Sequence, residues 1–269
     1  MNRLVLLALW GAAAVALPAR QFDLGRTAEI TSATLHVLHE NPRAAGVLVF
    51  VAGFGIDGAG LAGDPRWVSA CEKNRWAWVA VNFMSSLDDA NEHRGFTHAG
   101  RGSGEMLRRG LKLAGYDGQP LFLVGYSSGA QFTWSFVHHA GGVRAWCLYA
   151  ASSFEPRDRP PLPMPGLLAY GVQDSRRFEA MYDLFQGQRD RGARVTWLPL
   201  DDLAHERPAK AEGFFLAFLS ACAGEPGEVR VGNRDRAVRR TEVAAAERRS
   251  HSWLPEALLA EWLRVAAKW

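Results

Sequence analysis

Cysteine is scarce in this sequence, with only Cys71, Cys147 and Cys222 among 269 residues. An odd number leaves at least one thiol unpaired, so we do not expect a scaffold held together by disulfides. The three spacings match no zinc-binding pattern, and we expect neither a metal nor another cofactor. Cys147 lies in the apolar run RAWCLYAA, which indicates a buried core residue. Whether any two of the cysteines pair is left open by the sequence.

The sequence also lacks an apolar run long enough for a comfortable membrane span, which takes ~20 residues. The N-terminal apolar run covers only residues 4–16 and follows the positive charge of Arg3. It ends in Ala14-Val15-Ala16, a pattern typical of a signal-peptide cleavage site, with Ala19 as a second option. We therefore expect residues 1–19 to be a signal peptide that directs the protein to the periplasm or the medium. The alternative is an uncleaved N-terminal membrane anchor.

No part of the chain concentrates charge of one sign. The net charge is +3, and arginines are scattered among acidic residues rather than forming a basic stripe. This argues against nucleic acid as a partner. Hydrophobic residues make up 48% and charged residues 22%, which is the composition of a globular protein. We see neither an internal repeat nor a low-complexity linker, so residues 20–269 are interpreted as a single domain.

Apolar segments alternate with amphipathic ones along the chain, which predicts strands alternating with helices. Strands are expected at residues 30–38, 47–52, 76–82, 121–125, 144–150, 166–171 and 195–198. Helices are expected from residue 64 through 72, and at 101–113, 128–139, 176–191 and 209–221. This order predicts an α/β fold with a mostly parallel central sheet and helices on both faces. The alternating polarity of residues 30–38 predicts a strand at the edge of that sheet.

The C-terminal segment 225–269 differs in character, because a charged stretch precedes the sequence SWLPEALLAEWLRVAAKW. Ser252 is predicted to cap a helix that Pro255 begins. Its apolar face would contain Leu258, Leu259, Trp262 and Val265. We interpret the segment as an extension packed on the main domain; a helix that binds a partner is the alternative.

The chemistry of the chain is indicated by the stretch LFLVGYSSGA, residues 121–130, which contains the motif G-x-S-x-G around Ser127. An apolar strand runs into this motif and an amphipathic helix follows it. In such a context the serine sits on a strained strand-to-helix turn with its hydroxyl exposed at the sheet edge. The glycines Gly125 and Gly129 are needed because strand and helix backbones approach too closely for side chains. Ser127 is therefore the predicted nucleophile.

A serine nucleophile needs a base, and the base needs an acid to orient it. Asp174 ends the predicted strand 166–171 with the sequence GVQD, which places it at the same sheet edge as Ser127. Of the histidines after Asp174, His205 lies in a strand-to-helix loop, whereas His251 lies in the C-terminal segment. The predicted triad is Ser127, His205 and Asp174. Asp201 and Asp202 are rival acids because they lie close to His205 in sequence.

Two backbone N–H groups are predicted to form an oxyanion hole. The first is the N–H of Ser128, which follows the nucleophile at the start of a helix. The second is the N–H of Phe54, in the turn after the apolar run VLVFVA. Gly53 and Gly55 would allow this turn to approach a substrate closely. The alternative interpretation of the turn is a plain strand-to-helix connection.

These residues give the sequence a resemblance to the α/β-hydrolase superfamily. More closely, it resembles bacterial exported esterases of the polyhydroxybutyrate depolymerase and dienelactone hydrolase-like group. The motifs that carry the resemblance are VFVAGFG (49–55), DPRW (64–67), GSGE (102–105), LFLVGYSSGAQF (121–132), GVQD (171–174), the His205 loop and SWLP (252–255). The sequence departs from many members at Ala52, where they have histidine, and at Ala130, where they have a further glycine.

The resemblance implies a serine hydrolase that cleaves carboxylic esters of small or polymeric substrates through an acyl-enzyme. Between Ser127 and Asp174 only the proline-rich stretch 152–165 exceeds what the predicted elements need, so there is no room for a large cap domain. The cleft is therefore expected to be fairly open. One alternative is a serine peptidase of the same fold. Another is a catalytically silent binding protein of that fold.

Overall fold

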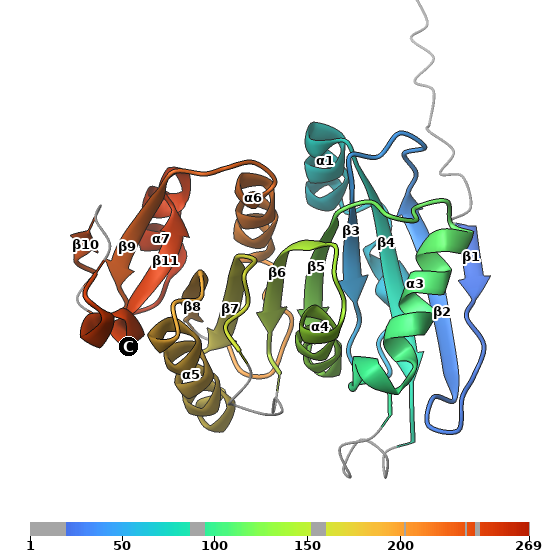
Figure 1. Ribbon diagram of the computed structural model, residues 1–269, viewed down its shortest axis with the longest axis horizontal. Coiled ribbons are helices and arrows are strands. Elements are labelled where there is room, and N and C mark those ends of the chain that lie inside the picture. Colours follow the sequence, from blue (N-terminus) through green and yellow to red (C-terminus); the bar gives the residue numbers. More distant parts are fainter. Residues whose placement is uncertain are drawn as a thin grey trace, which may run out of the picture.

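The structure is a computed structural model that describes residues 20–86, 95–151, 160–201, 203–234, 236–239 and 243–268. Within these residues, eight strands form one sheet in the order β1-β2-β4-β3-β5-β6-β7-β8 (Figure 1). The strands are β1 (Arg20–Asp23), β2 (Ser32–His39), β3 (Gly46–Val51), β4 (Trp76–Met84), β5 (Leu121–Tyr126), β6 (Val143–Tyr149), β7 (Gly166–Gly171) and β8 (Val195–Leu200). The predicted signal peptide, residues 1–19, lies outside the described part of the chain.

Strand direction divides the sheet into a short antiparallel part and a long parallel part. β1 and β2 are antiparallel to their neighbours, whereas every pairing from β4 across to β8 is parallel. The predicted mostly parallel sheet is thus confirmed. The predicted edge position of residues 30–38 is wrong, because β1 pairs along the outer side of β2, with Phe22 opposite Leu35. The four-residue sequence RQFD carries too little apolar pattern to predict such a strand.

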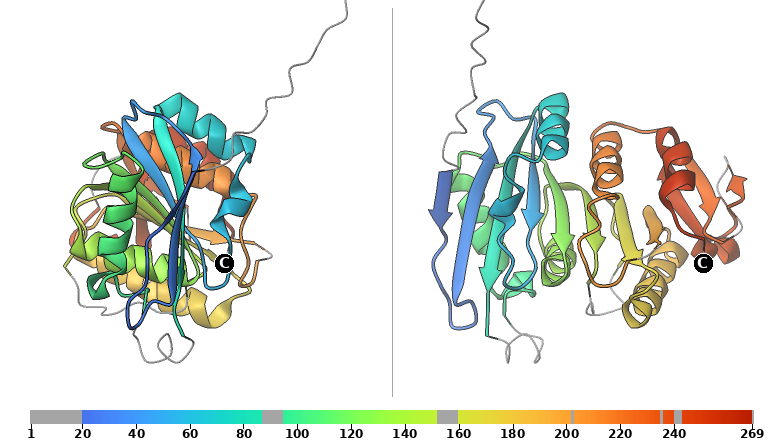
Figure 2. Two further views of the ribbon diagram at one scale, coloured as in Figure 1. Left: turned by 90° about the vertical axis from the view of Figure 1, so that its right-hand side faces the viewer. Right: turned by 180° about the vertical axis from the view of Figure 1, so that it is seen from behind.

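Helices cover both faces of the central strands, and these strands are accordingly apolar along almost their whole length. Every residue of β3, β5, β7 and β8 is buried. On one face, α1 (Pro65–Asn74) and α6 (Glu212–Cys222) form a core around Trp67, Phe214 and Phe215. On the other face lie α3 (Ser103–Leu113), α4 (Ser128–His139) and α5 (Ser175–Asp190). The view along the sheet shows the two helical layers with the sheet between them (Figure 2).

The C-terminal segment forms a small second sheet, which the sequence did not predict. Its strand order is β10-β9-β11, with β9 (Glu228–Gly232), β10 (Val238–Arg239) and β11 (His251–Pro255). Short helices η3 (Ala245–Ser250), η4 (Glu256–Leu258) and α7 (Leu259–Val265) complete the segment. The prediction that Ser252 caps a helix is wrong, because Ser252 lies within β11. The predicted apolar face does point inward: Leu258 and Trp262 are buried, and Leu259 and Val265 pack against the same core.

The C-terminal segment covers the open edge of the main sheet at β8. The N–H of Trp197 donates to Ser252 Oγ at 2.8 Å, and the carbonyl of Trp197 accepts from Trp262 Nε1 at 2.9 Å. Further along the same edge, the N–H of Ala267 donates to the carbonyl of Pro199 at 2.8 Å. An uncovered edge strand would expose these backbone groups and could pair with another chain. The segment thus supplies partners for three backbone groups of β8, and in Figure 1 it lies beside this strand.

Within the described part of the chain, no large cap domain interrupts the fold. The connection from β6 to β7 spans residues 150–165, and its described residues form neither helix nor strand. Residues 152–159 of the predicted proline-rich stretch lie outside the described part. Among the described helices, none has the length and apolar character needed to cross a membrane.

All three cysteines are buried and unpaired, at Cys71, Cys147 and Cys222. Burial raises the pKa of Cys71 and of Cys222 to about 12, and it raises the pKa of Cys147 well above its ordinary value. The thiolate is the reactive form of cysteine, and a raised pKa keeps the thiols protonated. We therefore expect none of the three thiols of the native protein to react with Ellman's reagent at pH 8. In guanidinium chloride three thiols should react. A thiol that reacts rapidly in the native protein would contradict this burial.

Candidate active site

Ser127 occupies the turn between the last residue of β5 and the first residue of α4. Its backbone has φ 54° and ψ −123°, a conformation that a residue with a side chain rarely adopts. Such strain costs about 1–3 kcal/mol and persists only where the surroundings enforce it. Here the N–H of Ser127 donates to the carbonyl of Tyr149 at 3.0 Å, and the carbonyl of Ser127 accepts from Ala130 N–H at 2.9 Å. The turn is therefore held from both sides.

The two glycines of the motif lie where backbone segments almost touch. A Cβ added at Gly125 would lie 2.6 Å from the carbonyl oxygen of Gly129. A Cβ added at Gly129 would lie 2.2 Å from the carbonyl oxygen of Val51 and 2.5 Å from that of Ala52. These are backbone atoms of α4, of β3 and of Ala52 directly after β3, so no side-chain rotation relieves the overlap. The close approach expected from G-x-S-x-G is present in the structure.

Replacing Gly129 by alanine should therefore destabilise the fold strongly. Inserting a methyl group into a packed interior costs about 1–3 kcal/mol and occasionally more, and we expect about 3 kcal/mol at this site. Gly213 provides the matched control: it is exposed in the first turn of α6 and an added Cβ meets nothing within 4 Å. Gly213→Ala should raise stability by about 0.5–1 kcal/mol. Chemical denaturation measures both changes, and wild-type stability in Gly129→Ala would refute the packing argument.

The structure brings the three predicted triad residues together at one edge of the sheet. Ser127 Oγ lies 3.0 Å from His205 Nε2, and His205 Nδ1 lies 3.3 Å from Asp174 Oδ2. Asp174 follows β7, and His205 lies in the connection from β8 to α6. A carboxylate can only accept, so Nδ1–H donates to Asp174, which leaves Nε2 to accept the proton of Ser127. This arrangement matches the geometry expected of a nucleophile, a base and an orienting acid.

A further residue, Arg177, contacts the acid of this set. Its Nη1 lies 2.8 Å from Asp174 Oδ1, the oxygen that does not face His205. Asp174 is only 8% exposed, and such a buried carboxylate needs a compensating partner. The sequence carries a signal for this pair, because Arg177 stands three residues after Asp174 at the start of α5. The rival acid Asp201 is exposed and makes no recorded contact with His205, while Asp202 lies outside the described residues.

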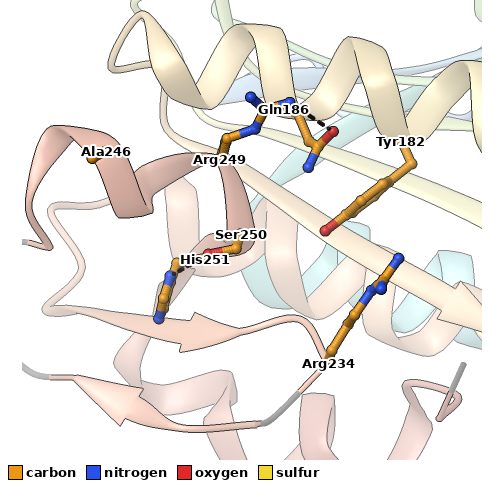
Figure 3. Close-up of a pocket in the computed structure, with 7 residues that line it drawn as sticks. All are labelled: Tyr182, Gln186, Arg234, Ala246, Arg249, Ser250 and His251. Atoms are coloured by element: carbon orange, nitrogen blue, oxygen red, sulfur yellow. Dashed lines mark hydrogen bonds between the residues drawn. The ribbon is translucent and has the colours of Figure 1, made fainter.

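The other late histidine, His251, lies in the C-terminal sheet and has no carboxylate partner among the described residues. Its Nδ1 lies 2.9 Å from the carbonyl oxygen of Glu247. Together with Arg234 and Arg249 it lines a separate cavity of about 520 Å³ beside α5 (Figure 3). None of the triad residues lines this cavity. The structure thus places only His205, of the two late histidines, next to Ser127.

The predicted oxyanion turn lies against the nucleophile. A Cβ at Gly53 would lie 3.1 Å from Ser127 Cβ, so a side chain here would crowd the nucleophile. The turn is braced from β4 by Asn82, whose Oδ1 accepts from Gly58 N–H at 2.9 Å and whose Nδ2 donates to Asp57 at 2.7 Å. The N–H of Phe54 donates to Ser128 Oγ at 2.7 Å. The sequence predicted both backbone groups as donors, but it did not predict this contact with the Ser128 hydroxyl.

The loop that carries His205 is anchored by a buried carboxylate, which the sequence analysis missed. Glu212, at the start of α6, is fully buried and accepts from Arg207 Nη2 at 2.6 Å and from Arg66 Nη2 at 3.1 Å. Its third donor is Trp67 Nε1 at 3.2 Å. Arg66 also donates to the carbonyl of Ala209. The N-terminus of α1 and the start of α6 therefore hold the residues that follow His205.

No protein-family model matches this chain, and no curated protein matches its sequence. Solved structures do match. A predicted dienelactone hydrolase from Klebsiella pneumoniae has a TM-score of 0.55 at 14% identity, over 77% of this chain and 98% of that chain. Esterase 2 of Thermogutta terrifontis, phosphorylated by paraoxon, has a TM-score of 0.51 at 14% identity, over 77% of this chain and 94% of that chain.

A third match differs in length. A puromycin-hydrolyzing peptidase of Mycobacterium tuberculosis has a TM-score of 0.54 at 14% identity over 77% of this chain, but this chain spans only 39% of the peptidase. Together these structures show that the chain has the α/β-hydrolase fold. The superfamily resemblance drawn from the sequence motifs is thus confirmed at the level of the fold.

Proposed function

We propose that this protein is a serine hydrolase that cleaves carboxylic esters through an acyl-enzyme. One observation carries the proposal. The Ser127 hydroxyl, on its strained turn, lies 3.0 Å from His205 Nε2, and the other nitrogen of that ring faces the buried Asp174. A serine without such a base is a weak nucleophile, and few structural roles require the strained turn.

In the first half of the reaction, Ser127 Oγ attacks the ester carbonyl carbon while His205 Nε2 takes the hydroxyl proton. Asp174 accepts from Nδ1–H, keeps the ring oriented and stabilises the imidazolium that forms. The carbonyl oxygen becomes an oxyanion, which donors near Ser128 stabilise. When this intermediate collapses, the bond to the alcohol oxygen breaks and His205 gives its proton to the leaving alcohol. The acyl group remains on Ser127.

In the second half, water takes the place of the alcohol. His205 removes a proton from the water as its oxygen attacks the acyl carbon, and a second oxyanion forms in the same position. Collapse of this intermediate breaks the bond to Ser127 Oγ, and the proton on His205 returns to the serine. The products are a carboxylic acid and an alcohol. All groups used in both halves belong to this chain, and no metal or cofactor is included in the proposal.

Two considerations favour esters over other acyl substrates. The full-length structural neighbours include an esterase, and an organophosphate has modified it. The β6–β7 connection, residues 150–165, is too short for a large cap domain, so we expect an open cleft. Such a cleft suits small or polymeric esters better than long acyl chains buried under a cap. The alternative of a peptidase is supported by the similarity to the puromycin-hydrolyzing peptidase, of which this chain spans 39%. Amide substrates therefore belong in the test.

The proposal predicts measurable turnover of p-nitrophenyl acetate and butyrate, with slower turnover of the octanoate and little of the matching p-nitroanilides. A fluorophosphonate probe should label the protein at Ser127. Preference for the anilides would favour the peptidase. The absence of both turnover and labelling would overturn the hydrolase hypothesis and favour a binding protein of the same fold.

A further inference from the structure

The hydroxyl of Ser128 occupies the position in front of the Phe54 amide. The distance from Phe54 N to Ser128 Oγ is 2.7 Å, which is a short N–H···O hydrogen bond. In this geometry the amide hydrogen points at the hydroxyl oxygen and not at open space. A substrate oxygen therefore meets the hydroxyl of Ser128 before it meets the N–H of Phe54.

The Ser128 hydroxyl still has its own hydrogen to donate. Over the described residues, no acceptor is recorded for this hydrogen and none for the Ser128 N–H. Both donors belong to the first residue of α4, directly after the nucleophile, where the helix dipole favours a negative charge. A hydroxyl and the N–H of the same residue can converge on one anionic oxygen. Ser128 thus offers two donors beside the carbon that Ser127 attacks.

The Phe54 amide is held in place and cannot easily turn toward a substrate. Gly53 lies against Ser127, and the end of the turn is fixed to Asn82 on β4. A hydroxyl that accepts a hydrogen bond becomes a stronger donor, because hydrogen bonds in a chain polarise one another. The fixed amide therefore strengthens the donor that stands in front of it.

We infer that the Ser128 hydroxyl is a catalytic residue that donates directly to the oxyanion, and that the Phe54 N–H acts through it. This inference rests on the proposed function and changes the predicted oxyanion hole. Its direct donors are the N–H and O–H of Ser128, and Phe54 is a positioning residue behind them. The hydroxyl hydrogen stays on Ser128 throughout, so the proton balance of the reaction is unchanged.

The decisive comparison is between Ser128→Ala, which removes the donor, and Ser128→Thr, which keeps it. Loss of one oxyanion donor lowers kcat by about 10²-fold, and we expect this loss in Ser128→Ala with KM nearly unchanged. Ser128→Thr should recover most of the activity. Ser69→Ala is the control for the same substitution, since Ser69 is exposed on α1, and it should keep wild-type kcat. Thermal unfolding of each variant checks that the fold is intact.

A second readout separates a transition-state contact from a structural effect. A trifluoromethyl ketone forms a tetrahedral adduct with a serine nucleophile, so its affinity should fall in Ser128→Ala by the same factor as kcat/KM. Wild-type or higher kcat in Ser128→Ala would overturn the inference and make the Phe54 N–H the direct donor. A wild-type protein that is inactive and unlabelled by fluorophosphonate would instead overturn the proposed function itself. The two failures are therefore distinguishable.

Discussion

Ser127→Ala is expected to lower kcat for p-nitrophenyl butyrate by about 10⁵- to 10⁶-fold, the loss typical of removing a serine nucleophile. Alanine cannot form the acyl-enzyme, and His205 then has no hydroxyl to activate. The fold should be unchanged, because the Ser127 hydroxyl bonds to His205 and backbone hydrogen bonds, not this hydroxyl, hold the turn. Steady-state kinetics together with fluorophosphonate labelling measure the effect.

Two companion variants test the rest of the triad. Asp174→Asn keeps the shape of the acid but allows the wrong imidazole tautomer, and it should lower kcat by about 10⁴-fold. His205→Ala should approach the loss seen for Ser127→Ala, because the serine then lacks its base. The three losses should not add in combination, since the residues act as one unit. Retained labelling of Ser127→Ala, or additive losses, would contradict the assigned roles.

The strand-to-helix turn at Ser127 and the meeting of the triad residues at one sheet edge could be predicted, because local sequence patterns and strand direction determine them. Two glycines around a serine, an apolar strand before it and a helix after it determine the turn almost without tertiary information. Parallel strands bring their carboxyl ends to one edge, so residues that follow β5, β7 and β8 meet there. The predicted bounds of α4 and β7 agree with the structure residue for residue.

The contacts of single donor atoms could not be predicted in this way. The bond from Phe54 N–H to Ser128 Oγ joins residues far apart in sequence and depends on the rotamer of one hydroxyl. The same holds for Glu212, whose partners Arg66 and Trp67 belong to α1. From the sequence alone, Glu212 is one acidic residue at the start of a helix. Its complete burial results from the packing of α1 against α6, which no local sequence pattern shows.

The C-terminal sheet was missed for a different physical reason. Its strands β9 (EVRVG) and β11 (HSWLP) are only five residues long, and they contain charges and a proline, so their local pattern is weak. Strand formation here depends on long-range pairing, such as Trp253 opposite Arg230, and on packing against β8. The helical spacing of Leu258, Trp262 and Val265 was a stronger local signal. It correctly predicted an inward face but assigned too long a helix.

Glu212→Ala is expected to lower the free energy of unfolding by about 3 kcal/mol. Removing one partner of a buried ion pair costs about 3–5 kcal/mol, because the remaining charges lose their compensation. Here the side chains of Arg207 and Arg66 remain 35% and 41% exposed, so water reduces the cost and the lower end of that range applies. The indole N–H of Trp67 also loses its acceptor within the core. Denaturant unfolding measures the change.

The same variant should impair catalysis, because Arg207 stands two residues after His205 and is held by Glu212. A loosened loop would place His205 Nε2 less often within hydrogen-bond distance of Ser127, which lowers kcat more than it changes KM. Glu212→Gln keeps an acceptor of the same shape and should cost less on both measures. Glu72→Ala is the control on the exposed side of α1, where a change within about 0.5 kcal/mol is expected. Equal stability and kcat in Glu212→Ala and wild type would show that the arginines find other partners and that the His205 loop does not depend on this carboxylate.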